Sequence, residues 1–415
     1  KGRTFMEHFI TEIWIDSLRH LSDIKIELNR ERRTNLLLTG KNGSGKTTVL
    51  NALKKYLRVV NNGMIENIEV LYPQAKKAAL ERIKHAVTED EKFHAESEYL
   101  SYTQMIEEYV EGIYITFNET DGIERSYQKG KFLTAFYSAD RKTGIEKQDG
   151  VENVVLNTSY SLDSNPGAIL LKYLVHLKTQ QAYARNEGDY ATLRLLEEWF
   201  ERFVRALRVL LDNPDIQLKY DYKTYDFEII ESDKKSFGFD QLSDGYSAAI
   251  QIVADLILRM EQNWLQKGSL SSYDTEGIVL IDELETHLHI SLQKTILPFL
   301  TDFFPNIQFV VATHSPYVLN SVENCVIYDL ENKIRMEDMS GYSAEGIVEG
   351  YFCVESYSER LLQRVKRYEE LVNLKNPTDE ERAERAKILV EMKRVPGDLA
   401  REAKEAFDEI ESRRK

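Results

Sequence analysis

A run of eight residues near the start of the chain combines glycines, a lysine and a hydroxyl group at a spacing that suits phosphate binding. Residues 40–47 (GKNGSGKT) fit the pattern G-x-x-x-x-G-K-[ST]. The glycines let the backbone turn with positive φ, so that its N–H groups can meet phosphate oxygens. Lys46 is expected to reach the β- and γ-phosphates, and Thr47 to supply one Mg²⁺ ligand. The predicted nucleotide-binding residues of this loop are Gly40, Asn42, Gly43, Ser44, Gly45, Lys46, Thr47 and Thr48.

Two acidic residues follow a second apolar run much later in the chain. Residues 277–281 (GIVLI) predict a buried strand, and Asp282 and Glu283 come directly after it. Ligands of open parallel sheets sit at that end of the strands. Asp282 is expected to hold Mg²⁺, and Glu283 to orient or deprotonate the attacking water. Such a pair can also be an ordinary exposed pair of acids, but the phosphate loop upstream favours nucleotide hydrolysis.

A third element, residues 242–246 (LSDGY), stands immediately before a predicted helix. Ser243 and the free N–H groups at the helix start form a second anion-binding element. One nucleotide does not need two such elements from the same chain. We therefore expect Ser243 and Gly245 to face the nucleotide of another copy; the alternative is that Ser243 merely caps the helix.

A histidine follows a further apolar strand, predicted at 307–313. His314 at this strand end could contact the γ-phosphate and sense its loss. A lone histidine is usually structural, so the prediction depends on the order of the motifs around it.

Hydrophobic periodicity predicts the elements that must position these residues. A hairpin is expected over 11–28 with residues 18–20 at its turn, then the strand and helix that flank the phosphate loop. Residues 55–109 read as helices, and a long amphipathic helix is expected over 246–262. The other predicted strands are 113–117, 124–128, 132–137, 216–222, 226–230 and 325–330, and the other predicted helices are 166–184, 189–211, 292–304 and three pieces after residue 357.

Composition excludes several classes of protein. The 415 residues include 54 basic and 69 acidic ones, a net charge of −15, so global charge does not argue for nucleic-acid binding. Two cysteines give no disulfide framework, which favours a reducing, cytoplasmic setting. No apolar run approaches the ~20 residues of a membrane span, so we expect no membrane partner.

The order of the motifs resembles that of ABC-type ATPases. Phosphate loop, LSDGY, IVLIDE and ATHS follow one another as in the soluble SMC/RecF/OLD-like branch (AAA_21-like) rather than as in transporters. The run 284–289 (LETHLH) and the sequence THSP at 313–316 resemble OLD-like proteins. The resemblance implies ATP and Mg²⁺ as cofactors, Glu283 and His314 as catalytic residues, and Thr47 and Asp282 as metal ligands. It also implies that Arg19, in a segment resembling the start of that branch, approaches the nucleotide.

This resemblance implies an α/β fold, a P-loop NTPase of the ABC/SMC-head type. The predicted parts are an N-terminal ATPase segment (1–62), a mostly helical insertion with short strands (63–235), a C-terminal ATPase segment (236–335) and a helical extension (336–415). The remainder resembles ATPase subunits of bacterial antiphage systems such as Septu, PARIS and retron-associated ATPases. That implies a homo-oligomer that controls a separate effector, a nuclease or a toxin. OLD proteins carry a TOPRIM nuclease, but no Asp-x-Asp follows His314 here, so we expect no nuclease in this chain.

Three alternatives stay open at this point. A RecF-type repair ATPase would grip DNA on ATP-driven closure. A transporter's nucleotide-binding subunit is disfavoured by LSDGY, THSP and the large insertion. A scaffold would bind ATP and hydrolyse it very slowly.

Overall fold

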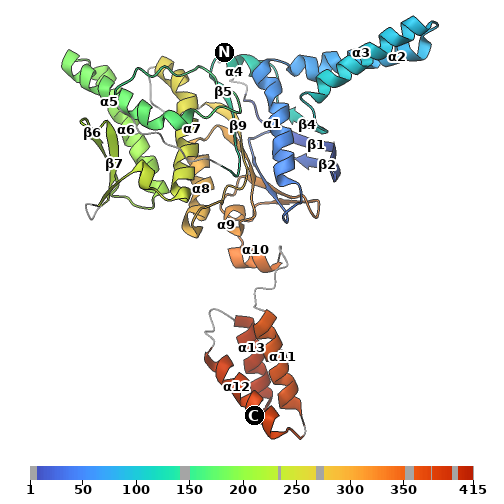
Figure 1. Ribbon diagram of the computed structural model, residues 1–415, viewed down its shortest axis with the longest axis vertical. Coiled ribbons are helices and arrows are strands. Elements are labelled where there is room, and N and C mark those ends of the chain that lie inside the picture. The colour runs from blue at the N-terminus through green and yellow to red at the C-terminus, as the bar shows by residue number, and fades with distance from the viewer. Residues whose placement is uncertain are drawn as a thin grey trace. The chain divides into compact units, whose positions relative to one another are not determined.

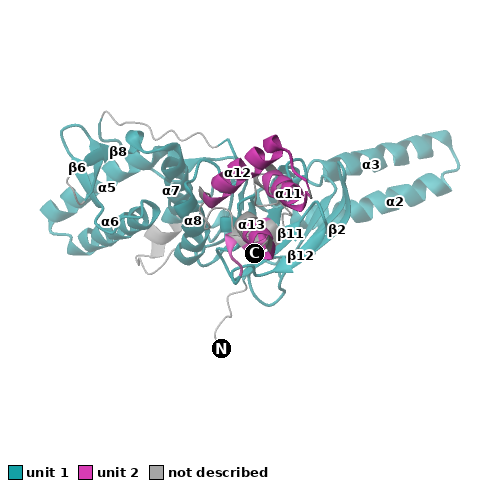
Figure 2. Ribbon diagram, turned by 90° about the horizontal axis from the view of Figure 1, so that it is seen from below, with its two compact units in different colours: residues 1–341 teal, residues 342–415 magenta. Residues whose placement is uncertain are grey.

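The structure is a computed structural model, and it describes residues 7–140, 150–231, 235–267, 275–350, 359–374, 376–394 and 401–414. The chain divides into two compact units, residues 1–341 and 342–415 (Figure 2). The first unit carries all of the predicted site residues.

A six-stranded sheet forms the centre of the first unit (Figure 1). Its strand order is β12-β11-β3-β10-β9-β5. Five of these strands run parallel to one another, and the sixth, β12, pairs antiparallel with β11. Nearly every residue of the inner strands is buried, as expected of a parallel sheet with both faces covered. The strands are β3 (Asn35–Thr39), β5 (Phe132–Tyr137), β9 (Glu276–Ile281), β10 (Ile307–Ala312), β11 (Cys325–Asp329) and β12 (Ile334–Glu337).

A second, antiparallel sheet of order β2-β1-β4 packs beside the first. It consists of β1 (Ile10–Leu18), β2 (Leu21–Glu27) and β4 (Ile113–Phe117). Side chains of β1 alternate, with Ile13 and Ile15 buried and Trp14 exposed on the outer face. The predicted hairpin is confirmed; residues 19 and 20 form its turn, and residue 18, also predicted there, ends β1. Both sheets share one hydrophobic core with helix α1 (Lys46–Asn62).

Helices flank the sheets, and a small third sheet lies among those on one side (Figure 1). The third sheet has the order β6-β7-β8. Its strands are β6 (Gln217–Asp221), β7 (Asp226–Ile230) and β8 (Ser236–Gly238). The helices are the π-helix η1 (Asn67–Leu71), α2 (Tyr72–His85), α3 (Glu89–Glu107), α4 (Ile123–Gln128), the 3₁₀ turn η2 (Pro166–Ile169), α5 (Leu170–Glu187), α6 (Tyr190–Leu210), the 3₁₀ turn η3 (Phe239–Gln241), α7 (Asp244–Lys267), α8 (Ile290–Phe303) and α9 (Pro316–Leu319).

One predicted strand is wrong. Residues 124–128 lie in helix α4, not in a strand. Gly122 takes a left-handed conformation with φ of 80° and starts the helix. Ile123 and Tyr127, four residues apart, are both buried, which is a helical period and not an alternating one.

The predicted insertion is less separate from the ATPase sheets than its helical composition suggests. β5, which lies within residues 63–235, is an edge strand of the central sheet and pairs with β9 along its length. β4, also within that range, pairs with β1. At the other boundary, β12 straddles residue 335 and remains part of the central sheet.

The second unit is helical. It contains α10 (Ala344–Gly350), α11 (Glu359–Asn373), α12 (Asp379–Arg394) and α13 (Arg401–Arg414). Val365, Tyr368, Leu371, Met392 and Phe407 form its apolar core. The three helical pieces predicted after residue 357 are therefore confirmed as three helices with a core of their own.

A buried carboxyl group in the first unit gives its stability a predictable pH dependence. Glu261 of α7 is fully buried, and Trp199 of α6 donates its indole N–H to it at 3.1 Å. Burial raises the pKa of Glu261 to about 7. Because this folded-state pKa exceeds the ordinary value of 4.5, the unfolded chain loses the proton first as pH rises. The contribution of Glu261 to the free energy of unfolding is therefore largest below pH 4.5, and it decreases as the pH rises to about 7.

Replacing this carboxyl by an amide is expected to remove that loss. Glu261→Gln keeps an oxygen for the Trp199 N–H but cannot ionise. Its free energy of unfolding at pH 8 should exceed that of the wild type by on the order of 2–3 kcal/mol, with little difference at pH 4.5. Urea unfolding at both pH values measures this, with exposed Glu201→Gln as the control. An unchanged pH slope in Glu261→Gln would show that burial does not hold this proton.

Candidate nucleotide site

Three of the predicted motifs end neighbouring parallel strands. The phosphate loop follows β3, His314 follows β10 and the paired acids Asp282 and Glu283 follow β9. These strands lie side by side in the order β3-β10-β9. The carboxyl ends of parallel strands meet at one edge of a sheet. The sequence-distant residues Lys46, Asp282 and His314 are therefore brought to the same edge.

The phosphate loop turns tightly because three of its glycines take positive φ. The φ angles are 128° at Gly40, 84° at Gly43 and 103° at Gly45. A Cβ on Gly40 would lie 2.8 Å from the Ser44 hydroxyl oxygen, so the loop closes on itself there. Gly45 is the N-cap of α1 and no side chain caps that helix. The first turn of α1 thus presents N–H groups to an anion, as a phosphate site requires.

Lys46 holds its ammonium group within the loop. Its Nζ donates to the carbonyl oxygen of Gly40 at 2.7 Å and to that of Lys41 at 3.1 Å. Burial lowers the pKa of Lys46, while the charges of Glu285, Glu283 and Asp282 oppose that shift. The ammonium therefore sits between the phosphate loop and the acidic strand end, where a γ-phosphate would lie.

The β1–β2 turn lies against the phosphate loop. The Nε2 atom of His20 is 3.3 Å from the carbonyl oxygen of Ser44, and a Cβ on Gly45 would lie 2.8 Å from the Leu21 side chain. Arg19, next to His20, is exposed and takes a left-handed φ of 55°. Arg19 therefore lies in the turn that contacts the phosphate loop, and its nucleotide contact stays a prediction. His20 is a loop contact that sequence reasoning missed.

The acids after β9 differ in their surroundings. Asp282 is buried, and its backbone N–H donates to the carbonyl oxygen of Tyr137 at 2.8 Å. Glu283 takes a left-handed φ of 47°, and the Thr286 hydroxyl donates to its carboxylate at 3.1 Å. Left-handed backbone is costly for a residue with a side chain and is found where surrounding structure enforces it. Asp282 is thus buried behind the turn, whereas the carboxylate of Glu283 is held by the turn itself.

A third acid, Glu285, holds the loop that carries His314 in place. No role was predicted for Glu285. It accepts hydrogen bonds from the Thr313 hydroxyl, at 2.7 Å, and from the backbone N–H of His314. The Ser315 hydroxyl donates to Gln293 at 2.6 Å and caps α9. The signal was present, because Glu285 stands two residues after Glu283 in the run compared with OLD-like proteins.

His314 is half-buried beside these charges. Burial, followed by the positive charge of Lys46, lowers its pKa, and the nearby acids oppose this in part. The imidazole is therefore neutral at physiological pH, with one ring nitrogen to donate and one to accept. A neutral ring can hydrogen-bond to a γ-phosphate or to the attacking water.

The LSDGY element (residues 242–246), which we call the signature element, spans the start of α7. Ser243 is exposed, and its carbonyl oxygen accepts from the Ser247 N–H at 2.9 Å. Gly245 is buried, and a Cβ there would lie 2.3 Å from the His287 carbonyl oxygen. A close approach of α7 to the loop after the paired acids therefore already requires a glycine at 245, whatever nucleotide contact it makes.

A buried ion pair ties α7 to the acidic strand end. Arg259 donates to Asp255 at 2.7 Å, and both side chains are almost inaccessible. The Tyr137 hydroxyl donates to Asp255 at 2.6 Å, and the carbonyl oxygen of the same Tyr137 accepts the N–H of Asp282. Arg259 also donates to the carbonyl oxygen of Thr134 at 3.1 Å. Asp255 and Arg259 stand four residues apart in α7, the spacing at which two side chains of one helix meet.

These residues fit ATP with Mg²⁺. The uncapped helix start, the inward ammonium and the positive-φ glycines suit a triphosphate, and Thr47 with Asp282 would hold the metal. When bound, the metal would neutralise charge on the transferred phosphoryl group. Within the described residues there is no cluster of three or more His, Cys, Asp or Glu side chains that could hold a metal by themselves.

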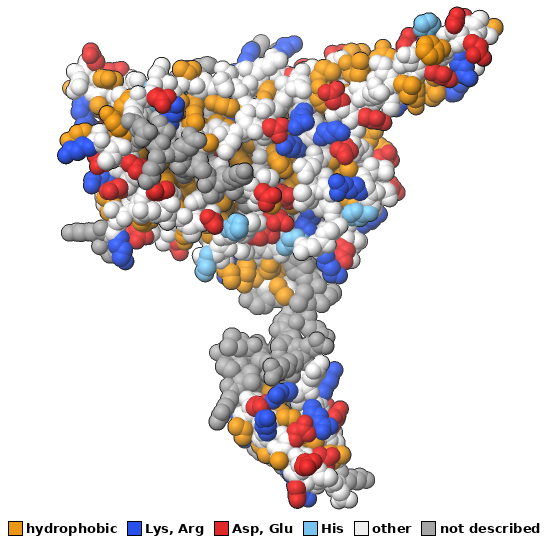
Figure 3. Space-filling view, viewed as in Figure 1, with side chains coloured by type: hydrophobic (Ala, Val, Ile, Leu, Met, Phe, Trp, Pro, Cys, Tyr) orange, Lys and Arg blue, Asp and Glu red, His pale blue; other side chains and the backbone are white. Residues whose placement is uncertain are grey.

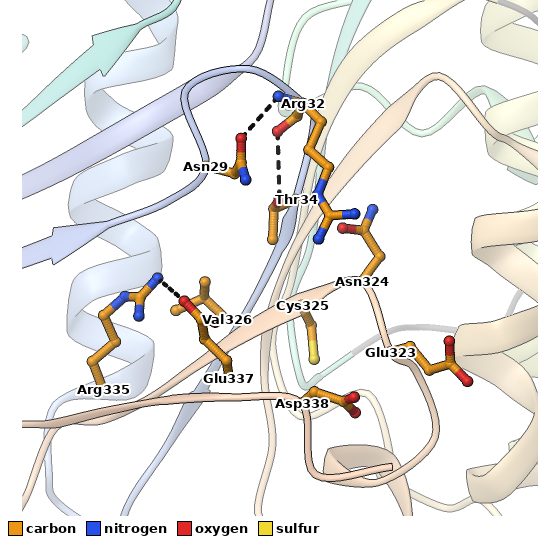
Figure 4. Close-up of a pocket in the computed structure, with 10 residues that line it drawn as sticks. All are labelled: Asn29, Arg32, Thr34, Glu323, Asn324, Cys325, Val326, Arg335, Glu337 and Asp338. Carbon is orange, nitrogen blue, oxygen red and sulfur yellow. Dashed lines mark hydrogen bonds and ion pairs between the residues drawn. The ribbon is translucent and has the colours of Figure 1, made fainter. Parts of the chain in front are cut away.

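A polar pocket of about 450 Å³ lies at the opposite edge of the central sheet (Figure 4). It is lined by residues at the amino ends of β3 and β11, such as Thr34 and Cys325. Its Arg335 already pairs with Glu337 at 2.6 Å. Because the phosphate loop follows the other end of β3, this pocket is not part of the nucleotide site.

One protein-family model matches part of the first unit. Residues 138–320 match the model AAA_21, described as "AAA domain, putative AbiEii toxin, Type IV TA system". That segment includes the LSDGY element (residues 242–246), the paired acids and His314. The phosphate loop lies outside it, so its assignment rests on motif and geometry.

Two curated proteins are similar to this chain along most of its length. The chain is 26% identical over 394 residues to the Septu protein PtuA of Bacillus mycoides (strain KBAB4), covering 91% of this chain and 49% of that protein. It is 24% identical over 422 residues to the Retron Vc95 probable ATPase of Vibrio cholerae serotype O1 biovar El Tor, covering 84% and 80%. The predicted resemblance to Septu and retron ATPases is confirmed. The chain spans about half the length of the Bacillus protein.

A solved SMC head bound to the C-winged helix domain of ScpA aligns with a TM-score of 0.40 at 11% identity, over 81% of this chain and 100% of that chain. The predicted α/β P-loop fold is confirmed by the sheet order and the loop geometry of this chain itself. Across the described residues, no helix is both long and apolar enough to cross a membrane.

Proposed function

We propose that this chain binds ATP with Mg²⁺, hydrolyses it in a paired arrangement, and through that cycle controls a separate effector protein in antiphage defence. The observation that carries the proposal is the meeting of Lys46, Asp282, Glu283 and His314 at one edge of the sheet. The relationship to the Septu and retron proteins supports the defence role.

In this proposal each residue has one task. Gly40–Thr48 and Arg19 hold the triphosphate, and Thr47 and Asp282 hold the metal. Glu283 takes the proton of the attacking water, and neutral His314, fixed by Glu285, detects the γ-phosphate. Ser243 and Gly245 of a second copy close the site from the other side, so that two chains enclose two ATP molecules.

The shared site has a direct test in mixtures of two inactive variants. Lys46→Ala breaks the phosphate loop and Ser243→Arg breaks the signature element. A mixed pair contains one site with both halves damaged and one site with both intact. An equimolar mixture should therefore recover about a quarter of wild-type hydrolysis, because half of the pairs are mixed and each has one working site.

Each variant alone should stay inactive at every concentration, and wild-type hydrolysis per subunit should fall on dilution. No recovery in the mixture, or full activity of Ser243→Arg alone, would contradict the shared site. The measurement is steady-state phosphate release.

A RecF-type role in DNA repair is the second candidate. It predicts DNA binding that ATP strengthens and that weakens steeply with salt. Filter binding at two salt concentrations, with and without ATP, separates the two roles.

A further inference from the structure

A buried hydrogen-bonded network joins helix α7 to the strand that borders the paired acids. Arg259 and Asp255 of α7 pair at 2.7 Å, and the Tyr137 hydroxyl donates to the same carboxylate at 2.6 Å. The side chains of Arg259 and Asp255 are 2% and 0% exposed, unlike the acidic and histidine side chains that gather at the surface near α8 and α9 (Figure 3). Tyr137 is the last residue of β5, and its carbonyl oxygen accepts the backbone N–H of Asp282 at 2.8 Å. The network therefore reaches from α7 to the backbone of a predicted metal ligand.

The carboxylate of Asp255 accepts hydrogen bonds on both of its oxygens. Oδ2 accepts from Tyr137 and Arg259, and Oδ1 accepts the backbone N–H of Gly167 at 3.0 Å. A Cβ on Gly167 would lie 3.0 Å from the backbone nitrogen of Asp255, so the chain packs directly against α7 there. Arg259 in turn donates to the carbonyl oxygen of Thr134, within β5, at 3.1 Å. These contacts leave the Asp255 side chain little freedom to move.

The same arginine holds a loop that reaches the helix of the phosphate loop. Arg259 donates to the carbonyl oxygen of Ser161 at 3.0 Å. Two residues further on, the Asp163 carboxylate pairs with Lys54 at 2.5 Å and with Arg58 at 2.8 Å, both in α1. α1 begins in the phosphate loop, and α7 begins within the signature element. The network thus connects the two helices that carry the two predicted halves of the nucleotide site.

Stability alone is a weak explanation for this network. Moving two charges out of water is costly even when they pair, and an apolar pair of similar volume is often as stable. A buried charged pair does impose a defined geometry, because both partners must keep their hydrogen bonds. β5 is an edge strand that pairs with β9, and within the described residues no strand flanks it on the other side. The bond to Asp255 supplies the missing constraint on Tyr137.

We propose that Tyr137 and Asp255 are positioning residues for Asp282, and that through them α7 couples Mg²⁺ binding to the pairing of two copies. The Tyr137 hydroxyl, anchored on Asp255, fixes the carbonyl oxygen that holds the Asp282 backbone. A shift of α7, when a second copy closes on the signature element, then moves the Asp282 backbone as well. By linkage, pairing becomes stronger when the metal site is filled. This inference rests on the proposed function, in which Asp282 holds the metal and Ser243 faces the other copy.

Tyr137→Phe tests the positioning role, because it removes only the hydroxyl. Calorimetric titration with ATP at a series of Mg²⁺ concentrations should show a Mg²⁺ requirement about tenfold higher, as expected when a group that supports a metal ligand is lost. ATP affinity without Mg²⁺ should stay unchanged, whereas general damage to the fold would lower it too. Tyr56→Phe is the matched control, since it removes another buried hydroxyl of this unit, which donates to Glu69 at 3.1 Å. An unchanged Mg²⁺ requirement in Tyr137→Phe, or an equal rise in Tyr56→Phe, overturns the positioning role.

A double-mutant cycle shows whether Tyr137 acts through Asp282. Asp282→Asn should raise the Mg²⁺ requirement by itself, because an amide oxygen replaces a charged ligand. Adding Tyr137→Phe to Asp282→Asn should raise the requirement no further, whereas two independent effects would multiply. Multiplied effects would show that the hydroxyl of Tyr137 acts elsewhere.

The coupling to pairing has a separate readout in Glu283→Gln, where ATP is bound but not consumed. At a protein concentration high enough for pairing, ATP binding should need at least about fivefold less Mg²⁺ than at a low one. Adding Tyr137→Phe should abolish that difference, and a difference that persists in full overturns the coupling. A wild type that neither binds nor hydrolyses ATP contradicts the proposed function and this inference together. A wild type that does both, with the same Mg²⁺ requirement as Tyr137→Phe, contradicts this inference alone.

Discussion

Glu283→Gln is expected to keep ATP binding while hydrolysis falls by roughly 10²- to 10⁴-fold, the range that a general base contributes. The amide keeps the size of the side chain and an oxygen for the Thr286 hydroxyl, which donates to Glu283 at 3.1 Å. It cannot take the proton of the attacking water. Because Glu283 already adopts left-handed backbone, its neighbours hold the turn and the substitution leaves the fold unchanged.

The same variant is expected to accumulate the paired, ATP-bound state. Addition of ATP and Mg²⁺ should shift Glu283→Gln to a larger species in size-exclusion chromatography with light scattering, whereas the wild type returns as ATP is consumed. Glu323→Gln, an exposed carboxylate at the other edge of the sheet, is the control. Wild-type hydrolysis by Glu283→Gln would remove the role given to Glu283.

The fold could be predicted where local pattern and tertiary environment agree. Strands β3, β9 and β10 are continuous apolar runs, and the residues of the candidate site follow their carboxyl ends. The strand predicted over residues 124–128 is wrong because a segment of one to two helical turns is too short for its hydrophobic period to be read. The buried positions Ile123 and Tyr127 reveal the helix only once burial is known.

The site was predictable in its motifs but not in the residues that hold them. The pattern GKNGSGKT and the adjacent acids Asp282 and Glu283 are recognisable in the sequence by their spacing. Glu285 reaches His314 across 29 positions of the chain, and His20 reaches Ser44 across the β1–β2 turn. Such contacts depend on strand order, and one sequence does not fix whether β10 lies next to β9. Sequence also could not show that Gly245 is needed for packing on His287.

The network of Tyr137, Asp255 and Arg259 also depends on contacts that one sequence does not reveal. Its members are polar residues in apolar segments, which marks them as paired but does not name the partner. The structure shows that β5, α7 and the turn at Asp282 are joined through them. Since α7 begins with the signature element, the carboxylate that would hold the metal and the helix that would face a second copy share one rigid support. That connection gives a physical route by which pairing could bear on hydrolysis.

Lys46→Ala is expected to lower the affinity for ATP roughly 10- to 100-fold, the loss of about one or two charged hydrogen bonds. Its ammonium group donates to two loop carbonyls, at 2.7 and 3.1 Å, and is partly desolvated. Binding of a triphosphate would replace neutral carbonyl partners by charged oxygens, which strengthens the interaction. The burial that lowers the pKa of Lys46 is therefore offset when the phosphates arrive.

The neighbouring lysine provides a matched control within the same loop. Lys41 pairs instead with Glu331, at 3.0 Å between Nζ and the carboxylate, and is largely exposed. Lys41→Ala should change ATP affinity by less than about twofold, as surface ion pairs contribute little. Calorimetric titration with ATP and Mg²⁺ gives both constants, and a thermal shift that ATP causes in Lys41→Ala but not in Lys46→Ala supports them. Equal losses in the two variants would mean that the loop's overall positive charge attracts the nucleotide, and that the inward position of Lys46 has no special part in binding.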